Sequence, residues 1–168
     1  MVDFKQLLAD LHNATPPATS PWEVGAQALD QALRAYPGHR LFTILAVDWT
    51  CHENQRIYTS EPRRYPRGGA KPLVPASEFY QEVILGGQAR FCADREACKR
   101  AFFDYPLIEA LGCESAVNVP VRVDGVTVGS LNLLHRRGWY DREMLAPLIL
   151  FADYAAALLV RHSSGAQA

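Results

Sequence analysis

The chain has 168 residues, with 17 Lys and Arg against 18 Asp and Glu, and a formal net charge of −1. This near-neutral balance excludes the broad basic surface of proteins that bind nucleic acid or anionic membranes. Hydrophobic residues make up 49% and charged residues 21%, which is the composition of a globular protein and not of a disordered chain. The length suits one domain with a helical extension.

The sequence predicts neither a targeting segment nor a metal site. No uninterrupted apolar run approaches the ~18 residues of a membrane-spanning helix. Residues 1–5 lack the basic start and apolar core of a signal peptide, so we expect a cytoplasmic protein. The four cysteines form no CxxC pair, and Cys and His together form no quartet at zinc spacing. We therefore expect free thiols and no cofactor.

Two amphipathic helices are expected before the first strand. In residues 3–12 the apolar side chains recur every three or four positions, as on one face of a helix. Residues 21–35 repeat this pattern, and Pro37 and Gly38 end it. Residues 1–38 are therefore predicted to be helices that pack on the following domain or form a dimer interface.

The middle of the chain is predicted to alternate strands with short helices. Strands are expected over residues 40–48, 55–60 and 89–92. Helices are expected over residues 77–85, 94–102 and 104–111. Residues 61–75 contain four Pro and two Gly, which predicts a loop without regular structure.

The clearest local signal is a β-hairpin. Residues 115–123 and 126–135 are predicted strands, joined by Asp124 and Gly125. Asp-Gly suits a two-residue type I′ turn, because both of its central positions need a positive φ.

Two asparagines interrupt the apolar pattern of the hairpin strands. In a regular hairpin with this turn, Asn118 faces Leu131 and Asn132 faces Val117. The two amides are then expected on opposite faces of the sheet, so at most one of them can face a pocket. Each is open to two interpretations, a ligand contact or a hydrogen bond to a neighbouring loop.

The longest helix is expected over residues 141–161, with Pro147 kinking it or shifting its start. One apolar stripe of this helix is expected to cover the sheet. A second stripe consists of Met144, Phe151, Tyr154 and Leu158. A helix that is apolar nearly all round has to be buried nearly all round. We therefore predict a homodimer through the terminal helices; the competing explanation is that the N-terminal helix covers the second stripe within one chain.

Three short motifs follow one another around the hairpin. A Leu-Gly pair at residues 111–112 precedes a Ser-bearing strand that ends in Val-Pro at residues 119–120. A Gly-x-Leu-x-Leu strand at residues 129–133 returns, and an apolar helix closes the chain. In this order the motifs and elements of residues 40–160 resemble a GAF domain, the sensory fold related to PAS domains.

The resemblance implies an α+β fold with a central antiparallel sheet of five or six strands. The terminal helices would cover one face, and short helices would lie beside a ligand pocket on the other. It divides the chain into N-terminal helices at residues 1–38 and a GAF domain at residues 39–162. It also implies a non-enzymatic sensor that binds an unknown small molecule, works as a homodimer, and passes the state of its ligand to a separate partner, with no role for nucleic acid or membranes.

The predicted pocket is bounded by the hairpin sheet, the helices of residues 94–111 and the loop of residues 61–75, where aromatic side chains are dense. The candidate ligand-binding residues are Phe79, Phe91, Phe102, Phe103, Tyr105, Cys113, Ser115 and Asn118. The loop also carries positive charge that could meet an anionic ligand, but a solvated loop is the favoured explanation, because surface charges need no partner. Its basic residues are Arg63, Arg64, Arg67 and Lys71.

Two other functions stay open. One branch of the GAF family, the free methionine-(R)-sulfoxide reductases, uses cysteine redox chemistry. The Gly-Val-Cys-Gly segment of those enzymes is absent here, and Ala116 stands where they carry a hairpin Glu, so we predict no catalytic residue. The other alternative is an interaction module whose pocket is filled by its own side chains.

Overall fold

The computed structural model describes residues 2–17 and 19–166 and shows a six-stranded sheet covered by helices. The strand order is β3-β2-β1-β6-β5-β4, and all neighbouring strands are antiparallel. The strands are β1 (Leu41–Asp48), β2 (Glu53–Thr59), β3 (Lys71–Pro72), β4 (Arg90–Cys92), β5 (Ser115–Val123) and β6 (Val126–His135). The predicted α+β fold with an antiparallel sheet is confirmed.

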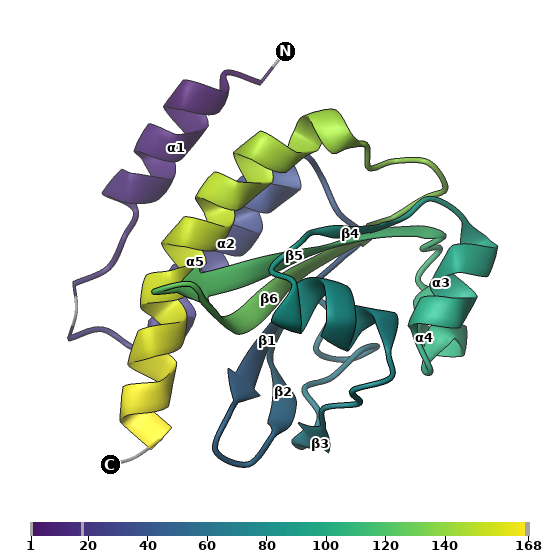
Figure 1. Ribbon diagram of the computed structural model, residues 1–168. Helices are drawn as coiled ribbons and strands as arrows, with labels where there is room; N and C mark the ends of the chain where they lie inside the picture. The colour runs from purple at the N-terminus through teal and green to yellow at the C-terminus, as the bar shows by residue number, and fades with distance from the viewer. Residues whose placement is uncertain (1, 18, 167–168) are drawn as a thin grey trace.

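The helices divide between the two faces of the sheet (Figure 1). Those on the first face are α1 (Phe4–Asn13), α2 (Trp22–Ala35) and α5 (Leu145–Ala166). They enclose the larger core, which holds Phe42, Leu131 and Leu133 of the sheet. Those on the second face are the π-helix η1 (Phe79–Leu85), α3 (Arg95–Ala101) and α4 (Tyr105–Ala110). The predicted layering, with terminal helices on one face and short helices on the other, is therefore correct.

Side-chain caps explain where several helices begin. Asp3 accepts a hydrogen bond from the backbone N–H of Lys5 (3.0 Å) and Asp94 from that of Ala97 (2.9 Å), which satisfies amides that have no partner within the helix. A short 3₁₀ turn, η2 (Arg142–Met144), precedes α5. Because α5 begins at Leu145, Pro147 lies in its first turn, where the missing N–H breaks no helical hydrogen bond.

One expectation for the second face is wrong in detail. The segment predicted to hold no regular structure contains β3, in which Lys71 and Pro72 pair with Asn54 and Glu53 at the edge of the sheet. A proline is tolerated at an edge because it donates no hydrogen bond to the ladder there. The remainder of residues 61–75 forms a loop, as expected.

The register of the β5–β6 hairpin differs from the predicted one. The turn is as expected, with Asp124 at φ 50° and Gly125 at φ 79°. Between Val121 and Arg122, however, the register shifts by one residue, so that Asn118 faces Asn132. A β-bulge of this kind moves every later side chain of one strand to the opposite face relative to its partner. Both asparagines therefore lie on the same face, and the prediction of opposite faces was wrong.

A glycine allows this bulged strand to lie close to β1. A Cβ added to Gly129 would collide with the carbonyl oxygen of Leu45 on β1 and with the side chain of Leu159 on α5. Any larger residue there would have to push β6 away from one of these two neighbours.

The second apolar stripe of α5 is covered within the chain. Phe151 is fully buried, and its ring meets that of Phe4 in α1 edge-on, with centroids 5.6 Å apart. Leu158 is also buried and packs so closely on Gly25 of α2 that a Cβ at Gly25 would lie 2.5 Å from it. Within the described residues, the N-terminal helices therefore cover Phe151 and Leu158 of this stripe, as the competing explanation expects.

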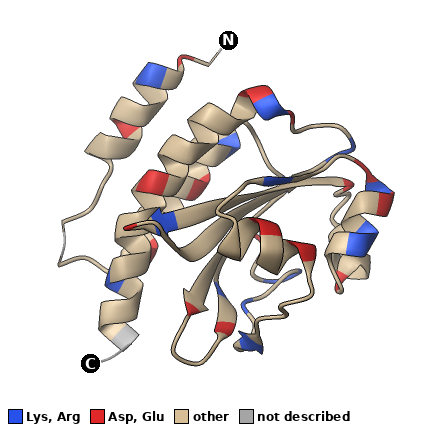
Figure 2. Ribbon diagram, in the orientation of Figure 1, with Lys and Arg blue, Asp and Glu red and all other residues tan. Residues whose placement is uncertain are grey.

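The outward face of α5 is apolar as well. Ile149, Leu150 and Val160 are 45%, 46% and 49% exposed. Figure 2 shows few charged residues along α5, and only Asp153 and Arg161 carry charge between Leu145 and Ala166. Within the described residues, one segment, Arg142–Gly165, is long and apolar enough to cross a membrane; an 18-residue stretch of it has a mean hydropathy of 1.8 and is 33% buried. Its inner side packs on β5 and α2, as a core helix does.

Candidate ligand-binding site

A cavity of about 690 Å³ lies on the second face of the sheet. Its floor is formed by residues of β2, β1, β6, β5 and β4, and its walls by η1, the segment between β2 and η1, and the segment from α3 to Asp104. This is the position expected from the sequence. The volume falls within the range of about 300–1,000 Å³ that is usual for small-molecule sites.

The structure brings half of the predicted site residues to this cavity. Those that line it are Phe79, Phe102, Phe103 and Asn118. Those that do not are Phe91, Tyr105, Cys113 and Ser115.

Each of the four residues outside the cavity has another role. Phe91 follows Arg90 on β4 and therefore points to the opposite face, where it packs on the larger core. Tyr105 and Cys113 belong to a smaller core cluster beneath α3 and α4. Ser115 donates a hydrogen bond to the carbonyl oxygen of Arg136 (2.6 Å), which fastens the segment after β6.

A chain of hydrogen bonds crosses the floor of the cavity through four strands. Nε of Arg90 donates to Oδ1 of Asn118 (3.0 Å), and Nδ2 of Asn118 donates to Oδ1 of Asn132 (2.8 Å). Asn132 in turn donates to Oγ1 of Thr43 (3.3 Å) and accepts from the hydroxyl of Ser130 (3.1 Å). All of these side chains are buried, so the network holds each member in one orientation.

Arg90 is the residue of this network that carries charge. It is only 6% exposed, and its guanidinium carbon lies 5.5 Å from the centre of the Phe79 ring and 5.8 Å from that of Phe102. Within residues 2–17 and 19–166, none of the ion pairs includes Arg90. Its one side-chain hydrogen bond in that part of the chain uses Nε, so the two terminal nitrogens are left for another partner.

Other cationic side chains line the wall and mouth of the cavity. They are Arg56, Lys71, Lys99 and Arg100, and the one acidic residue of the lining is Asp104. The carboxylate of Asp104 lies 3.3 Å from Arg56 and accepts a hydrogen bond from the hydroxyl of Tyr65 (2.7 Å). Burial and this hydrogen bond raise the pKa of Tyr65 well above its ordinary value, so it stays protonated as a donor.

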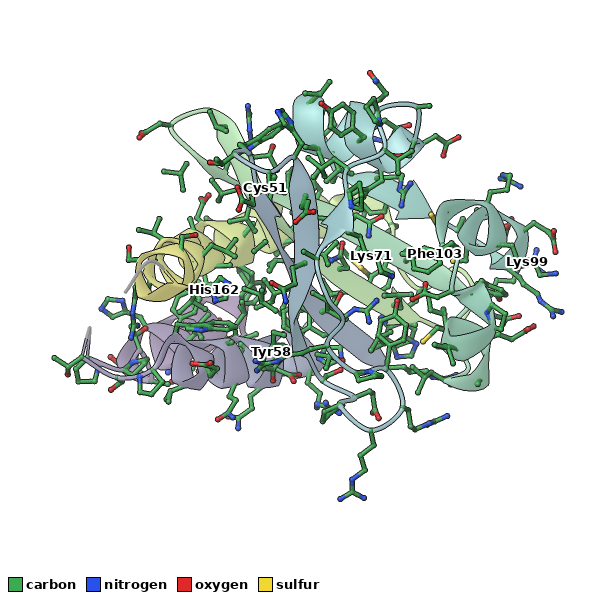
Figure 3. The ribbon with its side chains drawn as sticks, turned by 90° about the horizontal axis from the view of Figure 1, so that it is seen from below. Cys51, Tyr58, Lys71, Lys99, Phe103 and His162 are labelled. Carbon is green, nitrogen blue, oxygen red and sulfur yellow. The ribbon has the colours of Figure 1, made fainter. Side chains whose placement is uncertain are left out.

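At the mouth, Lys71 and Phe103 lie together (Figure 3), with Nζ of Lys71 3.9 Å from the centre of the ring. The Phe103 side chain is 79% exposed, which is unusual for a phenylalanine. The loop after β2 and the turn between α3 and α4 therefore meet through one cation–π contact beside the opening.

The sequence interpretation missed Arg90 and Asn132. Arg90 stands between Ala89 and Phe91 in a short apolar segment, and a charged residue in such a strand is the signal that could have found it. The regular hairpin register places Asn132 on the face of the sheet opposite Asn118, so only Asn118 is among the predicted site residues. Of the basic loop residues, Lys71 reaches the cavity, whereas Arg64 donates to the carbonyl oxygen of Ala110 (2.6 Å) instead.

None of the four cysteines lines the cavity. A hydrogen bond from Cys98 lowers the pKa of the Cys92 thiol, with a further contribution from the charge of Arg90, against the effect of burial. Burial raises the pKa of Cys113 to about 11. Cys92 and Cys98 therefore interact with each other outside the lining of this cavity.

Known proteins share this architecture. A GAF domain from a phosphoenolpyruvate-protein phosphotransferase of Coxiella burnetii has a TM-score of 0.72 at 15% identity, covering 99% of this chain and 100% of that one. A segment of a methyl-accepting chemotaxis protein has a TM-score of 0.67 at 21% identity, covering 94% of this chain and 96% of that one. The free methionine-R-sulfoxide reductase of Neisseria meningitidis, in complex with its substrate, has a TM-score of 0.68 at 15% identity, covering 96% of this chain and 89% of that one.

These identities are low, so the structures establish the fold and not the activity. None of the curated protein sequences compared with this chain matches it. A family model described as "GAF domain" matches residues 18–160, which is most of the 168 residues. The chain therefore belongs to the GAF domain family.

Proposed function

We propose that this protein is a non-enzymatic, cytoplasmic sensory module that binds a small molecule in the cavity on the second face of the sheet. The observation that carries the proposal is the cavity itself, at about 690 Å³, with aromatic walls and a buried polar network across its floor. In an interaction module whose pocket is filled by its own side chains, no such cavity would remain, and the buried polar network would have no ligand to contact.

Binding can be tested without knowing the ligand. Native mass spectrometry of freshly purified protein is expected to show a small molecule that is released on denaturation. Adding the released compound back to stripped protein should raise the melting temperature, since a ligand that binds only the folded state stabilises it. A native mass equal to that of the polypeptide alone, together with a melting temperature that no compound of a metabolite library changes, would contradict the proposal.

We expect no reductase activity. The expectation is supported by the lining of the large cavity, which includes none of the four cysteines. Turnover of free methionine-(R)-sulfoxide, followed as NADPH consumption with thioredoxin and its reductase, is expected to equal the rate without protein. Turnover that disappears in Cys92→Ser or Cys113→Ser would show that the protein is an enzyme after all.

The homodimer stays part of the proposal, with a different interface from the one first expected. The exposed apolar face of α5 is the candidate, because Ile149 and Val160 lie on it about 45–49% exposed. The double variant Ile149→Glu, Val160→Glu is expected to be a monomer at concentrations where the wild type is a dimer, measured by light scattering after gel filtration. Burial of such side chains contributes about 1.5–3 kcal/mol each.

Val126→Glu is the matched control for the dimer, since Val126 is 49% exposed and lies at the start of β6, beside the hairpin turn, and not on α5. It is expected to leave the dimer intact. A wild type that is monomeric at micromolar concentration would remove the dimer from the proposal.

A further inference from the structure

We propose that the ligand of this cavity has a single carboxylate on a flat apolar body, and that the terminal nitrogens of Arg90 bind the carboxylate. The inference rests on the proposed function, since it names the chemical class that the same cavity takes. It is carried by the placement of Arg90 and not by the family.

The first step concerns charge. An arginine that is 6% exposed and without an ion pair in the described part of the chain is costly, because a buried charge loses its water. Glu78 and Glu82 line a neighbouring pocket with Arg90, but neither of them forms an ion pair with it. The cavity lining holds five cationic side chains against one carboxylate, and that carboxylate already pairs with Arg56. A neutral or cationic ligand would leave this imbalance in place, whereas an anionic ligand would remove it.

The second step concerns orientation. Asn118 accepts from Nε of Arg90, and Asn118 is itself fixed by Asn132. Phe79 and Phe102, both part of the cavity lining, flank the guanidinium. The edge with the two terminal nitrogens is thus held in place, and two parallel N–H groups fit the two oxygens of a carboxylate.

The third step distinguishes a carboxylate from a phosphate. A phosphate brings more oxygens and more charge, and its sites gather several donors. Here Arg90 is the one buried cation of the lining. Arg56 and Lys99 are engaged with Asp104 and Glu96. The two terminal nitrogens of Arg90 are therefore the free charged donors in the buried part of the cavity, and they match the two oxygens of a single carboxylate.

The fourth step concerns the rest of the ligand. The remaining lining is largely apolar and includes the flat rings of Phe79, Tyr80 and Phe102 together with Leu45 and Leu134. Flat apolar groups pack well against such rings. The exposed cations Lys71 and Arg100 at the mouth would attract the anion before it enters.

The experiment compares three probes that share one ring system, 2-naphthoate, 2-naphthamide and 2-naphthyl phosphate, by calorimetry with the full chain. We expect 2-naphthoate to bind at least about tenfold more tightly than either of the others. In Arg90→Met the preference for the carboxylate should vanish, and in Arg90→Lys, which keeps the charge but not the paired donors, it should fall. Arg137→Met, at an exposed arginine outside the cavity lining, is the matched control and should keep the preference.

A ligand-free measurement separates this role from a structural one. If Arg90 is held for a ligand, Arg90→Met should melt at the same temperature as the wild type or higher, because an uncompensated buried charge has been removed. A clear drop in melting temperature would assign Arg90 to the fold and overturn the inference. If 2-naphthamide or 2-naphthyl phosphate binds as well as 2-naphthoate, the ligand class is wrong but the sensor stands. If none binds and native mass spectrometry shows no ligand, both proposals fail.

Discussion

Replacing Phe151 by Ala is expected to lower the free energy of unfolding by about 3–5 kcal/mol. The ring is fully buried between the sheet and the N-terminal helices, and it meets Phe4 edge-on. Its removal leaves a cavity where α1 and α5 contact each other, and the surrounding helices cannot collapse without losing other contacts. Urea unfolding followed by circular dichroism measures this loss.

Ile149→Ala is the matched control on the same helix. Ile149 is 45% exposed, so its truncation is expected to change the free energy of unfolding by no more than about 0.5–1 kcal/mol in the isolated chain. Equal losses for Phe151→Ala and Ile149→Ala would mean that α1 and α2 do not cover α5 in solution. The second apolar stripe of α5, which includes Phe151, would then be the candidate dimer interface.

Replacing Asp30 by Ala is expected to cost a similar amount, about 3–5 kcal/mol, because it breaks a buried charged cluster. Asp30 lies on α2 and is 8% exposed. Its carboxylate accepts a hydrogen bond from the hydroxyl of Tyr58 on β2 (2.7 Å) and lies 2.9 Å from Nε2 of His39. The cluster thus fastens α2 to the sheet. Asp153→Ala, at an exposed position of α5, is the control and should have little effect.

The Asp30 cluster also predicts a pH dependence. Burial alone would raise the pKa of Asp30, but the contacts with His39 and Tyr58 and the charge of Arg34 outweigh burial and lower it below the ordinary value of 3.8. A carboxyl group with a lower pKa in the folded state stabilises fully above its unfolded pKa, and the contribution is lost as the pH falls through the folded pKa.

We therefore expect the difference in unfolding free energy between wild type and Asp30→Ala to shrink as the pH falls from the ordinary value of 3.8 through the lowered pKa of the folded state. Urea titrations at a series of pH values measure it. A difference that stays constant over this range would show that Asp30 acts through packing and not through its charge.

The elements that could be predicted from the sequence are those whose signal is local. The Asp124-Gly125 turn, the cap at Asp94 and the apolar periodicity of α1 each follow from a few neighbouring residues. The pocket was located for the same reason, since the aromatic residues that bound it lie close together along the chain.

What could not be predicted depends on contacts between distant residues. Nothing near Phe151 says whether Phe4 or a second chain covers it. The burial of Arg90 arises only where β4 pairs with β5 and places it beside Asn118. The register shift at Val121 has one weak local sign, the glycine at position 129, and a regular hairpin was the simpler expectation.

That register shift determines the chemistry of the cavity more than any single side chain does. If the same residues paired without the bulge, Leu131 would face Asn118, and Asn132 would turn toward the helical core. The strand order and the turn would be unchanged, while Arg90 and Asn118 would lose the amide that orients them. A one-residue change of register therefore exchanges the polar and apolar side chains on the floor of such a pocket in one step, whereas point substitution would have to replace several residues.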